Sequence, residues 1–183
     1  MSVQRAQLPD WATRFPQLFA PDYWAWADTD IQFSLERPPE TLVSHIHLIC
    51  RTSGGIVVCG AEGRRFLPGG TRDPGEGVED TARRELLEEA GATLKGPLRW
   101  LGARRGDHRR PEPYRPHLPH PVSYWLYAVA DVTVDRPPSC PPGGEQVTDV
   151  LILPPAEAAA WLAEGEDVPV ADLVRLASAM GLV

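Results

Sequence analysis

One stretch, residues 70–92, constrains the fold of this chain more than any other: GTRDPGEGVEDTARRELLEEAGA. Apolar residues recur there at every fourth position: Val78, Ala82, Leu86 and Ala90. This period predicts an amphipathic helix over residues 78–90, and Gly91 is a typical C-terminal stop. We expect the apolar stripe to pack on a sheet, with the carboxylates beside it facing outward into a cleft.

The same helix carries a cluster of acidic residues. Glu85, Glu88 and Glu89 have i, i+3, i+4 spacing, so they share one side of a helix. Negative charge at this density favours a bound cation, and Mg²⁺ takes oxygen ligands and usually acts together with substrate phosphates. Taken alone, the cluster is also typical of an ordinary solvated helix surface.

The fixed positions around the cluster resemble a known family. Gly70, Glu76, the triplet Arg84–Leu86, the pair Glu88–Glu89 and Gly91 have the spacing of the Nudix box, and only Ala92 is smaller than the usual aliphatic residue. Leu67 to Gly70 resembles the usual lead-in to that box. The resemblance implies a metal-dependent hydrolase of diphosphate compounds and an α/β fold, the Nudix-type α/β/α sandwich with a mixed β-sheet.

Site roles follow from the resemblance, position by position. It implies Glu85 and Glu89 as primary ligands of Mg²⁺ or Mn²⁺, with Glu88 and the carbonyl of Gly69 as further ligands. Arg84 is expected to hold a box carboxylate by a charge-assisted hydrogen bond. Glu76 is expected to orient the helix glutamates. The catalytic group is thus predicted to contain Arg84, Glu85 and Glu88.

The general base stays open. A further glutamate near the last sheet strand often serves this purpose in the family, and Glu145 precedes a predicted strand at residues 147–153. An exposed loop charge explains Glu145 equally well. A box glutamate is the other candidate.

Residues 104–121 are expected to form a long loop that holds the basic patch of an acidic chain. Arginine forks suit phosphate oxygens, and Tyr114 could stack on a base. The predicted substrate contacts are Arg104, Arg105, Arg109, Arg110 and Tyr114. A mobile, solvated loop is the alternative, and its three histidines are too irregularly spaced to indicate zinc.

The remaining elements are predicted from short apolar runs and their breaks. We expect a short helix near residues 9–18, and helices at 155–163 and 170–180. Strands are expected at residues 30–35, 42–50, 56–61, 98–103, 123–134 and 147–153. We divide the chain into an N-terminal extension (1–40), a catalytic core (41–165) and a C-terminal helix (166–183), within one Nudix hydrolase domain.

Aromatic residues are frequent before the core. Packing is the favoured explanation of Trp24 and Trp26, while a base-binding platform or the surface of a homodimer stays open. His45 and His47 alternate on a strand and therefore share a face. A partly buried sheet face explains this pair more simply than a site does.

Composition excludes several classes. The formal net charge of −7 gives no support to nucleic acid as a partner. No apolar run approaches the length of a membrane span, and no secretory signal is evident, so we expect a cytoplasmic protein without a membrane partner. The three cysteines, Cys50, Cys59 and Cys140, are predicted to be reduced thiols.

We therefore expect a Mg²⁺- or Mn²⁺-dependent Nudix hydrolase that cleaves a nucleoside diphosphate linked to another group. A nucleoside triphosphate pyrophosphohydrolase is the alternative, and a non-catalytic nucleotide-sensing module is a third. Pro111 and Tyr114 lie slightly later than the positions that mark ADP-ribose or dinucleoside polyphosphate enzymes, so both assignments stay open.

Overall fold

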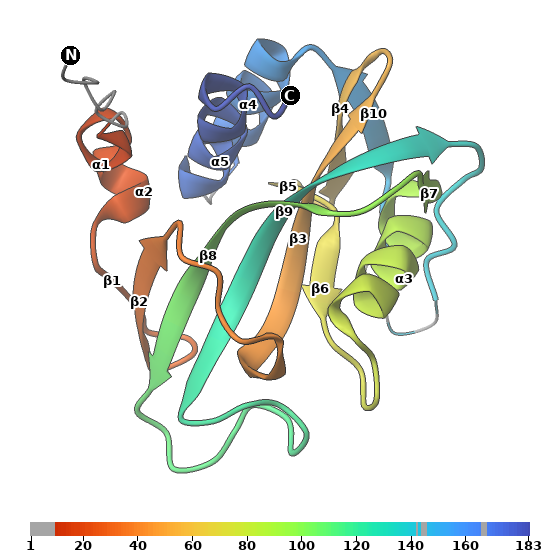
Figure 1. Cartoon of the computed structure of the whole chain (residues 1–183). Coiled ribbons are helices and arrows are strands. Elements are labelled where there is room, and N and C mark those ends of the chain that lie inside the picture. Colours follow the sequence, from red (N-terminus) through yellow and green to blue (C-terminus); the bar gives the residue numbers. More distant parts are fainter. Residues whose placement is uncertain (1–9, 142, 144–145, 166–167) are drawn as a thin grey trace, which may run out of the picture.

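The computed structural model describes residues 10–141, 143, 146–165 and 168–183. Its centre is a mixed sheet with the strand order β1-β2-β8-β9-β3-β4-β10, and the short strands β5, β6 and β7 pair with β4, β3 and β9. Helix α3 lies on one side of the sheet, and α4 and α5 lie on the other (Figure 1). This arrangement confirms the predicted α/β class.

The strands of the described residues are β1 (Asp22–Trp24), β2 (Thr29–Ser34), β3 (Val43–Thr52), β4 (Gly55–Ala61), β5 (Arg64–Phe66), β6 (Gly69–Thr71), β7 (Ala92–Leu94), β8 (Arg99–His108), β9 (Val122–Val134) and β10 (Asp149–Leu153). The helices are α1 (Trp11–Arg14), α2 (Pro16–Phe19), the 3₁₀ turn η1 (Glu40–Leu42), α3 (Val78–Ala90), α4 (Pro155–Ala163) and α5 (Val168–Ala179). Among the strand pairs given for this part of the chain, only β3 and β9 are parallel.

Each face of the sheet has its own apolar core. Ala82, Leu86 and Ala90 of α3 are fully buried against Ile46 and Leu48 of β3, as the period-four stripe predicts. On the other face, the core beneath α4 and α5 includes Ile49, Leu101, Leu173 and Val129. None of the described helices is long and apolar enough to span a bilayer.

Helix α3 begins and ends where the sequence predicts. The Gly77 N–H donates to Asp80 Oδ2 at 2.9 Å, and Glu79 and Asp80 place negative charge at the positive end of the helix. Gly91 ends the helix in the left-handed conformation, with φ of 58°. A Cβ at Gly91 would lie 1.9 Å from the carbonyl oxygen of Arg136, so only glycine fits there.

Two predicted boundaries are wrong. The helix expected over residues 9–18 is two short helices, because Pro16 begins a new turn at α2. The loop expected from residue 104 starts only after His108, because β8 continues as a strand through Arg104 and Arg105. Those two arginines point to opposite faces of the sheet, so their charge concealed a regular alternation.

Candidate active site

Strand β6 separates the acidic side of α3 from the opposite face of the sheet, and it is built from glycines. A Cβ at Gly70 would lie 2.2 Å from Glu85 Oε1. Gly69 has φ of +155°, and a Cβ there would lie 2.2 Å from the Ile46 carbonyl oxygen and 2.9 Å from His47 Nδ1. The two glycines thus let the backbone touch a box carboxylate on one side and β3 on the other.

Arg84 is the hub of the acidic cluster. It bonds both oxygens of Glu76, from Nε at 2.8 Å and from Nη2 at 3.0 Å. Its Nη1 donates to Glu85 Oε1 at 2.8 Å and to Glu88 Oε2 at 3.2 Å, and its Nη2 also donates to the Thr71 carbonyl. The Arg84 hydrogen bonds hold the pKa of Glu76 at about 2 and raise the pKa of the guanidinium itself.

Glu76 also fixes the loop that leads into the helix. Its Oε2 accepts the Asp73 N–H at 2.9 Å and the Thr81 hydroxyl at 3.0 Å. Arg72 braces the same loop through the carbonyls of Glu76 and Val43. The loop and the first turns of α3 are therefore one hydrogen-bonded unit.

Glu85 and Glu89 are more buried than we expected. Each is only 7% exposed, so they do not face outward into a cleft; β6 covers them. Glu89 Oε2 accepts the Gly69 N–H at 2.8 Å. Burial raises the pKa of Glu85, while the adjacent Arg84 guanidinium lowers it. The side chain of Glu88 is 24% exposed and is the more open of the three.

The donor set suits a hard divalent cation. Three carboxylates, Glu76, Glu85 and Glu88, pair with one guanidinium, and Glu89 lies on the same helix, which leaves negative charge that a metal ion would neutralise. Within the described residues, no three His, Cys, Asp or Glu side chains already converge as a ready-made ligand set. The close approach of Gly70 to Glu85 and of Gly69 to Glu89 nevertheless places oxygen donors of both kinds, carboxylate and backbone, at one end of β6.

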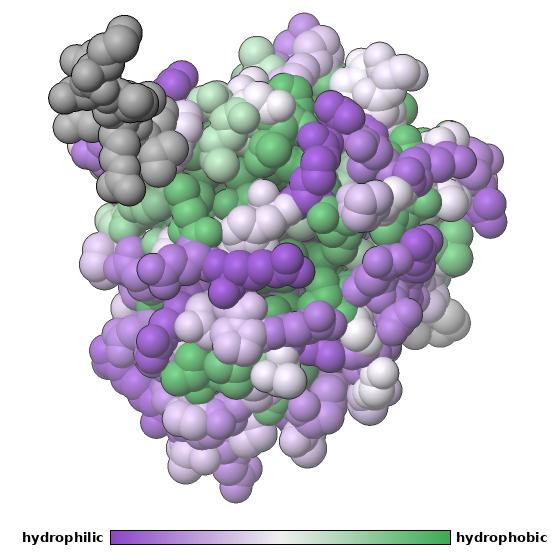
Figure 2. Space-filling view, in the orientation of Figure 1, coloured by the Kyte–Doolittle hydropathy of each residue, from purple (hydrophilic) through white to green (hydrophobic). Residues whose placement is uncertain are grey.

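The other face of the sheet carries an aromatic wall. Trp125 of β9 stacks on His45 of β3 at 4.2 Å between ring centroids and meets Trp24 of β1 edge-on at 4.5 Å. Trp26 stacks on Trp24 at 5.7 Å and is 64% exposed. Hydrophobic surface between hydrophilic bands is visible in the lower half of the molecule, where β2, β8 and β9 lie (Figure 2). Trp26 thus keeps most of its surface open to solvent while it stacks on Trp24.

Two cavities share this wall. A larger one of about 720 Å³ is also lined by His47, Leu67 and Arg104, and a smaller one of about 160 Å³ is also lined by Thr71, His108 and Tyr114. The smaller cavity includes Thr71, the last residue of β6, and the larger one includes His47, which pairs with Gly69 at the start of β6.

Polar groups in the smaller cavity form a defined chain. Thr29 Oγ1 donates to the Ala27 carbonyl, so it accepts from Nδ1 of His108 at 2.9 Å. The other ring nitrogen, Nε2, therefore accepts from the Ser123 hydroxyl at 2.7 Å. This chain gives both ring nitrogens of His108 a hydrogen-bond partner.

The structure separates the predicted substrate arginines. Arg104 lines the larger cavity and Arg110 the smaller one, where its Nη2 donates to the Trp26 carbonyl. Arg105 instead pairs with Asp107 and Arg109 with Asp30, both on exposed surface. Tyr114 is exposed at the rim of the smaller cavity. Glu145, the predicted general base, lies outside the described residues.

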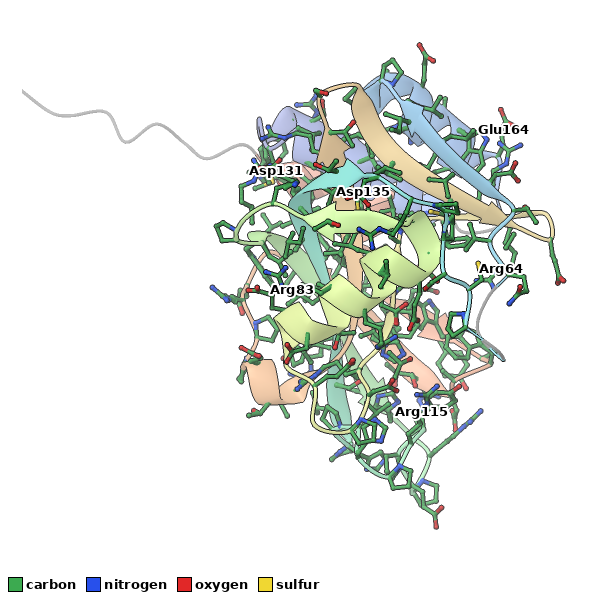
Figure 3. All side chains as sticks on the ribbon, turned by 90° about the vertical axis from the view of Figure 1, so that its right-hand side faces the viewer. Arg64, Arg83, Arg115, Asp131, Asp135 and Glu164 are labelled. Carbon is green, nitrogen blue, oxygen red and sulfur yellow. The ribbon has the colours of Figure 1, made fainter. Side chains whose placement is uncertain are left out.

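The loop after β8 returns to the box. His117 Nε2 donates to the Arg72 carbonyl at 2.8 Å, and Arg115 Nη1 donates to Asp73 Oδ1 at 3.4 Å. Figure 3 shows Arg115 below α3, whereas Asp131 and Asp135 lie at the opposite end of the sheet. The basic loop therefore lies beside the acidic cluster.

Sequence reasoning gave too little weight to the aromatic wall. The alternation of His45 with His47 and of Trp125 with Tyr127 was the available signal, because strands β3 and β9 pair them directly. The joining of Trp24 and Trp26 to Trp125 had no sequence signal, since it depends on β1 packing across β2 and β8.

Comparisons with known proteins agree with this architecture. The family model for the NUDIX domain matches residues 35–173. The Bacillus subtilis pyrophosphohydrolase BsRppH is similar in structure, with a TM-score of 0.61, 17% identity, and coverage of 89% of this chain and 98% of that chain.

A NUDIX hydrolase from Nitrosomonas europaea has a TM-score of 0.51, 15% identity, and coverage of 75% of this chain and 90% of that chain. At these identities the structural likeness shows the fold alone. No protein of curated function matches the sequence.

Proposed function

This chain belongs to the Nudix hydrolase family, and from that premise we propose that it cleaves the diphosphate bond of a nucleoside diphosphate linked to a second group. The single observation that supports this most is the contact between β6 and the buried carboxylates, with Gly70 against Glu85 and Gly69 against Glu89. The smaller cavity includes Thr71 of the same strand, and the larger one includes His47, which pairs with Gly69, so both cavities lie near the place where we expect the diphosphate to bind.

We assign the metal site to Glu85, Glu88, Glu89 and the carbonyl of Gly69, and the cation to Mg²⁺ or Mn²⁺. When bound, such a cation neutralises phosphoryl charge and lowers the pKa of water. Arg84 keeps Glu85 and Glu88 in place by hydrogen bonds at 2.8 and 3.2 Å, and the Gly69 N–H keeps Glu89 in place.

A carboxylate must also accept the proton of the attacking water. Glu88 suits this because it is the most open of the box glutamates and accepts a hydrogen bond from Arg84 at 3.2 Å, a longer distance than the 2.8 Å to Glu85. Glu145 remains the other candidate for the same step. The two can be separated by the pH profile of each glutamine variant.

The second group of the substrate has two places to bind. The smaller cavity, walled by three tryptophans and His45, has a volume close to that of an apolar protein cavity that binds one benzene ring, so a single planar ring fits it. We propose that Tyr114 and Arg110 close its rim over a base. The larger cavity is left for the remainder of the substrate.

The test is a panel of compounds incubated with Mg²⁺: ADP-ribose, nucleotide sugars, dinucleoside polyphosphates, coenzyme A and nucleoside triphosphates. Products are identified by chromatography. Cleavage inside a diphosphate that joins two groups supports the proposal. A clear preference for nucleoside triphosphates would favour the alternative pyrophosphohydrolase, and binding without turnover of any compound would indicate a sensing module.

Glu89→Gln is the matched variant for this panel. We expect turnover to fall at least ~10²-fold, since a ligand is removed. Glu79→Gln is the control, because Glu79 lies on the same helix but pairs with Arg83 on the exposed side. Equal turnover in the two variants would contradict the ligand assignment.

A further inference from the structure

Arg104 is a charged residue in an unusual position. It is 5% exposed on β8 and lines the larger cavity. No carboxylate among the residues that the structure describes lies within ion-pair distance of it, and no hydrogen bond of its side chain is seen in that part of the chain. Burial of a guanidinium without a counter-ion is costly, so this arrangement needs an explanation.

Aromatic rings supply part of that explanation. The Arg104 guanidinium carbon lies 5.4 Å from the ring centroid of Trp24 and 5.6 Å from that of Tyr127. Cation–π attraction offsets some of the cost of burial. It also orients the Arg104 side chain, because a planar guanidinium that lies against aromatic rings directs its N–H donors outward in its own plane.

Arg104 lines a cavity in which Asp22 is the one carboxylate among the described lining residues, and no ion pair joins Asp22 to Arg104. His47, in the same cavity, is held neutral: burial and the charge of Arg104 lower its pKa to about 4. Its Nε2 is buried without a hydrogen-bond partner in the described part of the chain. Arg64 and Arg65 also line the cavity, and Arg65 is paired with Glu164 at 2.6 Å.

Arg104 lies away from the box along the sheet. In the sheet, Arg104 pairs with Trp125, Trp125 with His45, and His45 with Thr71 of β6. Three strand spacings separate the backbone of Arg104 from that of β6, which is roughly 14 Å. The two phosphorus atoms of a diphosphate are joined through one oxygen, so one diphosphate is short compared with this separation.

We propose that Arg104 binds a phosphate monoester that the substrate carries outside the diphosphate cleaved at the box. This assignment rests on the proposed function for the position of the cleaved bond. A phosphate monoester fits because its oxygens accept the parallel N–H donors of a guanidinium fork. The substrate class is therefore a nucleoside diphosphate derivative with an additional terminal phosphate.

Matched substrate pairs test this directly. Coenzyme A and dephospho-coenzyme A differ by one phosphate monoester, as do ADP-ribose 2′-phosphate and ADP-ribose. We expect the wild-type protein to favour the phosphorylated member of a pair at least ~10-fold in kcat/KM. In Arg104→Gln this ratio should fall to about one through KM, and Arg104→Lys should keep part of it.

Arg51→Gln is the control, because Arg51 lies on β3, two strands from β8 in the same sheet, and pairs with Asp131, and it lines neither of the two cavities. It should keep the wild-type ratio. A ratio that is the same in Arg104→Gln and in Arg51→Gln would overturn the proposal, and so would a wild-type protein that prefers the members without the extra phosphate.

A binding measurement separates this proposal from the hydrolase assignment. Without a divalent cation, the box carboxylates repel anions, so inorganic phosphate is expected to bind at Arg104. By titration calorimetry, its Kd should be at least ~10-fold weaker in Arg104→Gln than in Arg51→Gln. Equal Kd values would overturn the Arg104 site even if the protein hydrolyses the panel, and a difference would support it even if no compound is cleaved.

Discussion

The two sides of strand β6 are built in opposite ways. On the α3 side, the acidic cluster comes from one continuous stretch, and Arg84 connects Glu76, Glu85 and Glu88 by short hydrogen bonds. On the other side, the aromatic wall joins residues from β1, β3 and β9, and ring contacts rather than ion pairs hold it together. The first side is rich in charge, and the second contains one buried charge, Arg104, that lacks a carboxylate partner among the described residues.

We propose that the acidic side carries out the chemical step and that the aromatic side selects the substrate. A rigid charged network keeps the same carboxylates in place for any diphosphate. A wall of rings assembled from distant segments changes shape with each substitution, so it can determine which compound binds. The comparison can be tested by variants that affect one side and spare the other.

The largest effect is expected from Arg84→Met. Removing this guanidinium leaves the buried Glu85 and the partly buried Glu76 and Glu88 without their counter-ion. Loss of one partner of a buried ion network costs about 3–5 kcal/mol of unfolding free energy. Urea denaturation measures this, with Arg83→Met as control, since the exposed pair of Arg83 with Glu79 is expected to contribute under ~1 kcal/mol. Equal losses would show that the acidic side is not a cooperative network.

The next largest effect is a pH dependence that originates on the aromatic side. Burial lowers the pKa of His45 to about 3 and that of His47 to about 4, below the value of 6.5 for an unfolded chain. As pH falls below about 6.5 the unfolded state takes up protons first, so stability is complete above that pH and declines toward pH 4. We expect about 2 kcal/mol less stability per histidine at pH 5 than at pH 8.

Denaturation of wild type and of His45→Gln/His47→Gln at both pH values tests this. The double variant should lose most of the slope. Glu76 contributes little at pH 5, because its folded-state pKa of about 2 affects stability mainly below the pKa of 4.5 that it has in an unfolded chain. An unchanged slope in the double variant would place the titrating groups elsewhere.

A smaller effect, on activity alone, is expected from Gly70→Ala. Its Cβ would lie 2.2 Å from Glu85 Oε1, so the carboxylate must move. We expect turnover with Mg²⁺ to fall about 10-fold, since small misplacement of reacting groups is costly. Gly54→Ala is the control, because its Cβ meets nothing nearer than 3.5 Å. Full activity in Gly70→Ala would mean that Glu85 does not need its position beside β6.

The smallest effect is expected from Trp26→Ala. Trp26 is largely exposed and stacks on Trp24, so its loss should hardly change stability. If it contacts a substrate ring, KM should rise about threefold to tenfold with kcat unchanged, the range expected for one aromatic contact. Steady-state kinetics on the best substrate of the panel gives the answer. A lower kcat with an unchanged KM would assign the wall to the chemical step.

The acidic side could be predicted because its information is local. Helix α3, its stop at Gly91 and the shared side of Glu85, Glu88 and Glu89 all follow from helical spacing. Burial of Glu85 and Glu89 was not predicted. It depends on β6, whose glycines pass close to the helix only once β6 has paired with β3.

The aromatic side could be predicted only in fragments. Alternation marks β3 and β9 as strands, but their parallel pairing, which brings His45 onto Trp125, joins residues eighty positions apart. The predicted strand ended too early, at residue 103, because two adjacent arginines resemble a loop. In the structure both belong to β8, with Arg104 buried and Arg105 exposed. Contacts of this kind depend on the order of the strands in the sheet, and no local sequence pattern encodes that order.

The central claim is that the carboxylates beside β6 bind a divalent cation. Titration with Mn²⁺, followed by the electron paramagnetic resonance signal of the free ion, measures its Kd without any substrate. We predict that Glu85→Gln and Glu89→Gln weaken Mn²⁺ binding at least ~10-fold relative to wild type, while Glu79→Gln binds it as wild type does. The same Kd in all four proteins would contradict the claim.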